Sequence, residues 1–267
     1  MNHCPTRGLI IMSQKEKQLA FILRAIPYAE RDLIVTLFTR EHGLRTAIAK
    51  NARSSKRFAG GVQLFRKVEA MLQPRKTQDV DLFLEMRVLA SYPKLEADYD
   101  RITIGSYGSE LMRELAQGDM DSQQAFDLLE SFYMQLDACD TEPRALETIL
   151  HHFEVLVLQN FGALPSLYEC HRCGKAHTEM ERLQCKRTGE GLLCGACRQP
   201  GEAVGLIEQE TLDILHYYTS PTSDHLPEAL LMPDMRFQAR RVLQNSFRLI
   251  LQKDLKSRPM LESILST

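Results

Sequence analysis

The chain has 267 residues, of which 44% are hydrophobic and 25% charged, and its formal net charge is −2 at pH 7. This composition is typical of a soluble globular protein with one large domain or two to three small ones. No apolar run approaches the ~18 residues that span a bilayer, and the run at residues 9–12 is shorter than the ~7 residues of a secretory signal core. We therefore expect a cytoplasmic protein, with residues 1–12 as an N-terminal extension and Met12 as a possible true start.

The net charge conceals an asymmetry along the chain. Residues 24–76 hold twelve Lys and Arg against four Asp and Glu, a net charge of +8, whereas residues 77–267 carry a net charge of −12. A basic segment attached to an acidic body predicts a polyanion-binding surface on one domain only. A solvated charged face would give the same composition.

Residues 18–88 alternate short extended runs with turn signals, which is typical of β-structure. Five strands are expected, at residues 18–24, 32–39, 44–50, 68–72 and 82–86. The first strand places Leu19 and Phe21 on one face. The third does the same with Leu44 and Ile48. Five short strands in about seventy residues predict a small barrel of the OB type, because an open sheet of that length would leave costly edges.

A basic loop, residues 51–61, separates the third and fourth expected strands. It combines three cations, one aromatic ring and a glycine pair: Arg53, Lys56, Arg57, Phe58 and Gly60-Gly61. Lys and Arg replace the counterions around phosphates, and an aromatic ring can stack on an unpaired base, although an aromatic at strand spacing is more often core. The loop is therefore a candidate for binding single-stranded nucleic acid. Cations on the adjacent strands could extend the contact: Arg45, Lys50, Arg66 and Lys67.

The apolar period changes to that of helices over residues 95–163. One helix should begin near Pro143, because proline fits a first helical turn, and end near Gly162. His151 and His152 lie on this helix. They lack the H-E-x-x-H spacing of a metalloprotease, so we expect a solvated or capped histidine pair.

Four cysteines form the most specific local pattern of the chain. Cys170 and Cys173 make one C-x2-C pair, and after twenty intervening residues Cys194 and Cys197 make another. This is the spacing of a four-thiolate zinc site. Two such turns facing each other close a tetrahedron around Zn2+ and leave no position for water. The pattern predicts one structural zinc ion and no catalysis at the metal.

Other assignments of these cysteines are weaker but open. An iron–sulfur cluster can also use four thiolates. Cys185, His171 or His177 could compete as ligands, although an ordinary loop or buried side chain is the simpler assignment for each. A thioredoxin-like pair would need a βαβ pattern, which neither pair has. Cys139 has no partner at ligand spacing, and we expect a free thiol there.

Two further amphipathic helices are expected after the cysteines, at residues 206–218 and 234–255, with Asp234 as the N-cap of the second. The polar side of the second helix could supplement nucleic-acid binding, but a solvated helix face is the simpler interpretation. Its cations are Arg236, Arg240, Arg241, Arg248 and Lys253. No Walker loop or G-x-G-x-x-G run is present, so the sequence does not support nucleotide hydrolysis.

Several runs, together with the cysteine pattern, form a specific combination: residues 20–23, 28–39, 43–45, 49–56, 63–65 and 255–258. In this combination the chain resembles the RecO family of bacterial recombination mediators, over nearly its whole length. It departs from the family at Asn51, where members often carry glycine, and in the residues before Met12.

The resemblance implies an α+β multi-domain protein with an N-terminal OB-fold β-barrel, a helical domain and an inserted four-cysteine zinc finger. The expected division is an extension, the DNA-binding barrel, the first part of the helical domain, the zinc finger and the second part of the helical domain. These segments are residues 1–12, 13–90, 91–166, 167–202 and 203–267.

The resemblance further implies binding to single- and double-stranded DNA and annealing of complementary strands. With the partner RecR, the protein would help to load RecA onto strands coated by single-stranded-DNA-binding protein, whose acidic C-terminal tail would dock on the helical domain. It would then be associated with the bacterial nucleoid. No catalytic residue is expected, since annealing makes and breaks no covalent bond.

Two other classes of function remain. An RNA-binding OB-fold and zinc protein without a role in recombination would use the same basic loop, and a comparison of DNA with RNA would separate the two. A zinc-dependent hydrolase would need an open metal position and a nearby general base, and no such ligand set is present at suitable spacing.

Overall fold

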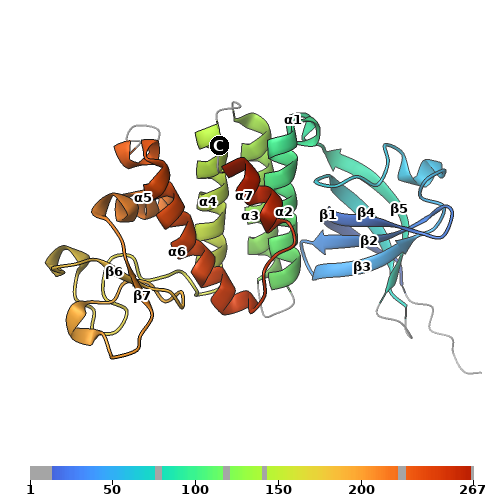
Figure 1. Cartoon of the computed structure of the whole chain (residues 1–267). Coiled ribbons are helices and arrows are strands. Elements are labelled where there is room, and N and C mark those ends of the chain that lie inside the picture. Colours follow the sequence, from blue (N-terminus) through green and yellow to red (C-terminus); the bar gives the residue numbers. More distant parts are fainter. Residues whose placement is uncertain (1–13, 76–79, 117–120, 140–142, 222–226, 266–267) are drawn as a thin grey trace, which may run out of the picture. The chain divides into compact units, whose positions relative to one another are not determined.

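The computed structural model describes residues 14–75, 80–116, 121–139, 143–221 and 227–265, so the extension expected at residues 1–12 lies outside the described residues. The chain divides into two compact units, Met1–Ser91 and Tyr92–Thr267 (Figure 1). The first contains a closed barrel, and the second contains the α-helices and a small two-stranded sheet.

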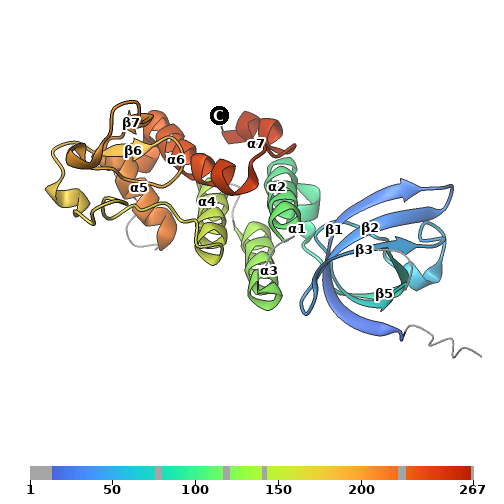
Figure 2. The same ribbon diagram turned by 90° about the horizontal axis from the view of Figure 1, so that it is seen from below.

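Five strands close into a barrel in the first unit (Figures 1 and 2). They are β1 (Glu16–Tyr28), β2 (Asp32–Thr39), β3 (Gly43–Ala49), β4 (Lys67–Gln73) and β5 (Asp81–Ala90). The order around the barrel is β1-β2-β3-β5-β4, with β4 pairing back onto β1. The β3–β5 pairing is parallel and the other four are antiparallel. This is the predicted OB-type barrel, in which closure removes the sheet edges.

Small side chains fill much of the barrel interior. The core holds alanines from three strands beside larger residues: Ala20, Ile22, Val35, Leu37, Ala47, Ala49, Val68, Ala70, Leu72 and Phe83. Leu19 and Phe21 share a face of β1, as expected, but the barrel core lies on the opposite face. The same holds on β3, where the inward residues are alanines and not Leu44 or Ile48. A narrow barrel closes only where some inward residues are small.

In the described residues of the second unit, seven segments are α-helices. They are α1 (Pro93–Ala97), α2 (Tyr99–Leu115), α3 (Ser122–Ala138), α4 (Pro143–Asn160), α5 (Gln209–Thr219), α6 (Pro233–Leu251) and α7 (Arg258–Leu265). Side-chain oxygens of Asp98 and Asp121 cap α2 and α3 by accepting backbone N–H groups, which satisfies donors that the first turn leaves free. The expected cap Asp234 is wrong, because α6 begins one residue earlier at Pro233 and Asp234 lies in its first turn.

An aromatic side chain of α3 packs directly against a glycine of α2. An added Cβ at Gly108 would lie 2.4 Å from Cε1 of Phe132. The Phe132 ring in turn stacks on Phe153 of α4, with centroids 4.0 Å apart. Only glycine leaves room for the ring at this position, so Gly108 fixes the spacing of the two helices.

The C-terminal helix α7 is attached to α2 through one carboxylate. Glu110 accepts the backbone N–H groups of Lys256 (3.1 Å) and Ser257 (2.8 Å) and the Ser257 hydroxyl (2.6 Å). These are the residues that lead into α7, so the carboxylate satisfies free donors at its start. The run 255–258, which contributes to the family resemblance, therefore has a structural role.

His151 is buried between two carboxylates and is not solvated, which corrects one of the two alternatives expected for this histidine. It is 3% exposed, and its Nδ1 lies 2.6 Å from Oε2 of Glu154 and its Nε2 3.7 Å from Oε1 of Glu147. The hydroxyl of Tyr107 donates to the other oxygen of Glu154 at 2.5 Å. Burial alone would lower the pKa of His151, but the two carboxylates raise it to about 9.

Two of the cations expected on a solvated face of α6 complete this buried network. The guanidinium Nε atoms of Arg236 and Arg240 lie 3.1 and 3.8 Å from the carboxylate of Glu147. Arg240 is only 8% exposed. Both are therefore structural ion-pair partners, whereas Arg241 and Arg248 are exposed.

The cysteine-bearing segment lies between α4 and α5. Its two short strands, β6 (Gln184–Lys186) and β7 (Val204–Leu206), pair antiparallel. Two one-turn 3-10 helices accompany them, η2 (His177–Glu179) and η3 (Gly195–Cys197). Among the described helices of both units, none is long and apolar enough to cross a lipid bilayer.

Candidate functional site

The four predicted cysteines converge in space. The sulfur atoms of Cys170, Cys173, Cys194 and Cys197 all lie within 4.8 Å of one another. The two pairs come from loops twenty residues apart in the sequence, so their convergence requires the fold and is not a consequence of spacing alone. Four sulfurs in this arrangement can hold one metal ion.

Each pair sits on a tight turn held by its own backbone. The N–H of Gly174 donates to the carbonyl of Cys170 (2.9 Å), and the N–H of Cys197 donates to the carbonyl of Cys194 (3.1 Å). Gly174 has a φ of 72°, a conformation that glycine adopts without strain. The turns therefore direct both sulfurs of each pair to the same side.

Two thiols of the cluster differ in how readily they ionise. Burial would raise the pKa of Cys170, but N–H groups of Cys194, Arg172 and Cys173 directed at its sulfur lower it to about 6. Hydrogen bonds with Cys173 and Cys194 raise the pKa of the Cys197 thiol to about 12. The cluster thus combines one readily formed thiolate with one thiol whose proton a metal ion would have to displace.

The competing ligands considered from the sequence lie elsewhere. Within the part of the chain that the structure describes, the four-cysteine group contains no further His, Cys, Asp or Glu. Cys185 is buried on β6, and burial raises the pKa of its thiol to about 12. The His177 ring packs against Tyr168 and His216. The donor set is therefore sulfur only, which suits Zn2+ in a closed site.

Ion pairs brace the loops around the cysteines. Arg172 donates to Glu202 (Nη2 to Oε1, 2.6 Å) and to the carbonyl of Cys197. The hydrogen bond from Arg172 helps to hold the pKa of Glu202 down to about 2. Lys186 pairs with Glu190 at 2.7 Å. Arg172 and Lys186 therefore stabilise the loops of the cysteine segment.

The basic loop of the barrel begins in a left-handed turn. Asn51 has a φ of 54°, a region that asparagine tolerates better than most residues and glycine better still. Its N–H donates to Asp32 (2.8 Å), and its carbonyl accepts the N–H groups of Ser54 (3.1 Å) and Ser55 (2.9 Å). The asparagine that departs from the family pattern thus preserves the turn geometry that glycine would provide.

The structure brings four of the predicted contact residues together at the surface. Lys50, Arg53, Lys56 and Arg57 are all exposed on or beside this loop. A groove of about 550 Å3 runs along the loop. Arg53 and Lys56 line it together with Ser54, Ser55 and Val62. These four cations are therefore exposed, and their contact with nucleic acid stays a prediction.

Three other predicted cations lie on the strands beside the loop or pair with barrel residues. Arg45 forms a salt bridge with the buried Asp81, with Nη2 2.6 Å from Oδ2. Arg66 donates to the carbonyls of Gly60 and Gly61 and so fixes the end of the loop. Lys67 is half-buried at the start of β4.

Phe58 is the predicted residue whose placement differs most from expectation. It is 3% exposed and belongs to the barrel core, where its ring meets Phe83 edge-on at 5.2 Å. A base could stack on this ring only if the core opened. The aromatic residue therefore anchors the loop, and we leave it out of the proposed contacts.

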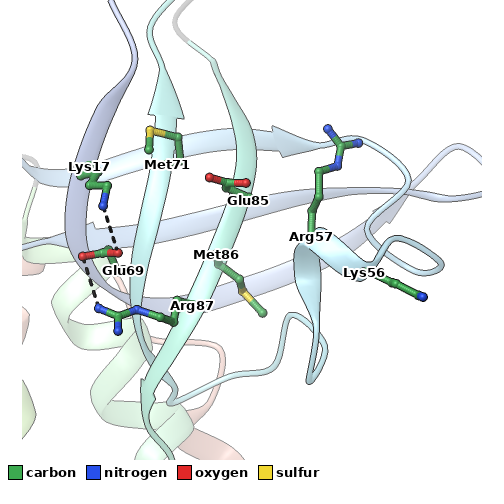
Figure 3. Close-up of a pocket in the computed structure, with 8 residues that line it drawn as sticks. All are labelled: Lys17, Lys56, Arg57, Glu69, Met71, Glu85, Met86 and Arg87. Atoms are coloured by element: carbon green, nitrogen blue, oxygen red, sulfur yellow. Dashed lines mark ion pairs between the residues drawn. The ribbon is translucent and has the colours of Figure 1, made fainter.

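Sequence reasoning missed a second charged surface on the barrel. Lys17, Glu69 and Arg87 converge in a hollow on the outer side of β1, β4 and β5 (Figure 3). Lys56 and Arg57 of the 3-10 helix η1 (Lys56–Phe58) also line this hollow. Outward positions on strands carry no apolar periodicity. Lys17 and Arg87 alternate with more buried residues along their strands, which indicates that their side chains point outward. This pattern does not show that the two side chains lie close together.

Comparisons with known proteins agree on one family. A model described as "Recombination protein O N terminal" matches residues 12–92, and one described as "Recombination protein O C terminal" matches residues 96–259. A protein of Anaeromyxobacter dehalogenans named "DNA repair protein RecO" is 34% identical over 182 residues, which cover 68% of this chain and 70% of that protein.

Relatives with the same printed name span more of the chain. The Myxococcus xanthus protein is 31% identical over 225 residues, covering 84% of this chain and 87% of its own length. The Syntrophus aciditrophicus protein is 29% identical over 252 residues, covering 93% and 95%. The similarity therefore includes the barrel, the helices and the cysteine segment.

Proposed function

The chain belongs to the RecO family, and from this premise we propose that it acts in DNA repair and recombination as a DNA-binding protein that anneals complementary strands. The observation that carries the proposal is the exposed cationic loop on the closed barrel. Lys50, Arg53, Lys56 and Arg57 lie on or beside it without being buried. Cations of this kind neutralise phosphates and release their counterions.

Annealing follows from charge neutralisation in physical terms. Two complementary strands repel each other, and a fixed cluster of cations lowers that repulsion and raises the local concentration of both strands. The bases must stay accessible for pairing, so contacts to phosphates suit the task better than contacts to bases. The burial of Phe58 is compatible with this division. The proposal requires no catalytic side chain.

We further propose that Cys170, Cys173, Cys194 and Cys197 hold one Zn2+ as a structural ion. Four thiolates fill the tetrahedron, so the ion would cross-link the two cysteine turns and leave no site for substrate. The sulfur-only donor set and the clustering within 4.8 Å support this assignment. The ion would stabilise the β6–β7 segment.

The wider assembly is also part of the proposal. On the family resemblance, the protein acts with RecR, meets the acidic tail of single-stranded-DNA-binding protein on its helical unit, and assists RecA at the nucleoid. Family membership supports these partners, and no contact of this chain is assigned to them. A strand-annealing assay on DNA coated with single-stranded-DNA-binding protein, with and without RecR, tests them.

The loop assignment is tested by a salt titration of oligonucleotide binding. The double variant Lys56→Ala/Arg57→Ala should lower the affinity for a labelled single strand. It should also reduce the slope of log K against log salt by about 1.4, at ~0.7 per lost phosphate contact. Fluorescence anisotropy at several salt concentrations measures both quantities.

The matched control removes two exposed cations from the other unit, Lys94 and Arg144. Lys94→Ala/Arg144→Ala should leave the slope unchanged. An unchanged slope in the loop variant would refute the loop assignment. A clear preference for RNA over DNA of the same sequence would favour the RNA-binding alternative.

A further inference from the structure

The second charged surface lies on the outside of the barrel. The hollow has a volume of about 350 Å3, with cations, carboxylates and methionines in its lining. These residues are Lys17, Lys56, Arg57, Glu69, Met71, Glu85, Met86 and Arg87. The four cations exceed the two carboxylates, and Met71 and the edge of the core residue Met86 add apolar contacts. Such a surface suits a flexible anion with apolar parts, which describes a single strand of nucleic acid.

Glu69 holds two of these cations at once. Its Oε1 lies 3.5 Å from Nζ of Lys17, and its Oε2 lies 3.6 Å from Nη2 of Arg87. The strand register explains the meeting, because Glu69 pairs with Arg87 across β4–β5 and lies diagonal to Lys17 across β1–β4. Figure 3 shows both cations turned towards this one carboxylate.

These ion pairs are weak and open to exchange. The side chains of Lys17 and Arg87 are 66% and 71% exposed, and that of Glu69 is 34% exposed. Exposed pairs at such distances contribute little to stability. A phosphate with free oxygens could therefore replace the carboxylate as the partner of either cation.

The hollow is continuous with the basic loop. Lys56 and Arg57 line it from η1, on the side away from the Glu69 ion pairs (Figure 3). Both residues also belong to the loop assigned above to phosphate binding. A nucleic-acid strand bound at the loop could therefore continue over β4 and β5 along the cations of this hollow.

We propose that this hollow is an extension of the single-strand contact and that Glu69 restrains it by competing with phosphates for Lys17 and Arg87. The inference rests on the proposed function, because it assumes that the loop binds single strands. With the carboxylate present, the three charged groups present a net charge of +1 to the strand. Weak, exchangeable contacts of this kind suit a protein that must release strands after they pair.

The test removes the restraint while keeping its shape. Glu69→Gln should tighten binding of labelled oligo(dT) on the order of fivefold, the scale of one exposed ion pair. The slope of log K against log salt should steepen by about 0.7, because one more unit of positive charge faces the strand. In the background Lys17→Ala/Arg87→Ala, the same substitution should give no such gain, since there is no cation left to release.

The control is Glu85→Gln, which makes the same charge change in the same hollow. Glu85 has no ion-pair partner among the residues that the structure describes. Any gain from Glu85→Gln should therefore be small and equal in both backgrounds. Melting temperatures close to that of the wild type would verify that each variant folds.

The outcomes separate this inference from the proposed function. If the wild-type protein does not bind oligo(dT) in dilute buffer, the proposed function fails. If it binds and loses affinity in the loop variant, but Glu69→Gln has no effect or the same effect in both backgrounds, only the role of Glu69 is overturned. A gain for Glu69→Gln that depends on Lys17 and Arg87 supports it.

Discussion

His151 and Glu154 form a buried ion pair within one turn of α4, with Nδ1 and Oε2 2.6 Å apart and both residues 3% exposed. Titratable or charged groups of α2, α4, α5 and α6 lie around the pair. The hydroxyl of Tyr107 in α2 donates to Glu154. On the other side of the imidazole lie Glu147 of α4 and its partners Arg236 and Arg240 of α6. The Tyr218 ring of α5 packs on the imidazole with the ring centroids 4.9 Å apart.

The first prediction is a loss of stability at alkaline pH. The pKa of His151 rises from 6.5 to about 9 in the folded chain, so its contribution is complete below the unfolded value and disappears as the pH rises through about 9. The full shift corresponds to roughly 3 kcal/mol. Urea denaturation from pH 6.5 to 9.5 should show the free energy of unfolding falling across this range.

The control for this prediction is His151→Gln. It should be less stable at pH 6.5 and should flatten the dependence between pH 6.5 and 9, since the titrating group is gone. At acid pH, Glu147 makes the free energy of unfolding fall as the pH falls. Burial alone would raise the pKa of this carboxyl, but the nearby cations lower it. An equal slope in the variant and the wild type would show that another group is responsible.

A second prediction concerns the spacing of α2 and α3. In Gly108→Ala, the new Cβ would meet Phe132 at 2.4 Å, and the ring cannot move freely because it is 2% exposed and stacked on Phe153. We expect a net destabilisation of about 1–3 kcal/mol from overpacking, although alanine is the better helix former. The double variant Gly108→Ala/Phe132→Leu should recover part of the loss in urea denaturation.

The barrel shows which parts of a fold the sequence alone can indicate. Strand positions and the closed architecture follow from short extended runs separated by turns, which are local signals. The side of β1 and of β3 that faces the core did not follow. Ala47 and Ala49 occupy the interior while Leu44 and Ile48 of the same strand do not. Available volume inside a closed barrel decides this, and volume is a property of all five strands together.

The charged residues show the same limit. The cysteine pairs were recognisable because each pair is local and its spacing is chemically restrictive. His151, Arg236 and Arg240 looked like surface residues. His151 and Arg240 are buried and Arg236 is half-buried, because partners from α4 and α6 meet. An ion pair between helices that are distant in the sequence does not change the hydrophobic periodicity of either helix. The burial of a charged residue could therefore not be inferred from its own segment.

A third prediction tests the metal directly. Cys173 is the exposed member of the cluster, so Cys173→Ser removes a ligand with little loss of packing. We expect the zinc content, measured by mass spectrometry of the purified protein, to fall from about one ion per chain, and the melting temperature to fall with it. Chelation of the wild type should have the same effect.

The matched control for the metal is Cys139→Ser, since Cys139 lies on neither cysteine turn and outside the four-sulfur group. It should keep the full zinc content. If the metal-free wild type melts at the same temperature as the loaded protein, the ion has no structural role.

The last prediction separates anchoring from stacking at Phe58. The ring is 3% exposed, lies in the barrel core and meets Phe83 edge-on, so Phe58→Leu should lower the free energy of unfolding by about 1–2 kcal/mol through lost contacts and imperfect refilling. The affinity for oligo(dT) at a temperature where the variant is folded should change by less than about twofold, because the cations of the loop keep their positions. A stacking residue would behave in the opposite way: stability would hold, and affinity would fall by the ~1–3 kcal/mol that one stacked base contributes. Measuring the free energy of unfolding and the affinity on the same preparation distinguishes the two roles, because substitution of an anchoring residue lowers stability and leaves affinity nearly unchanged.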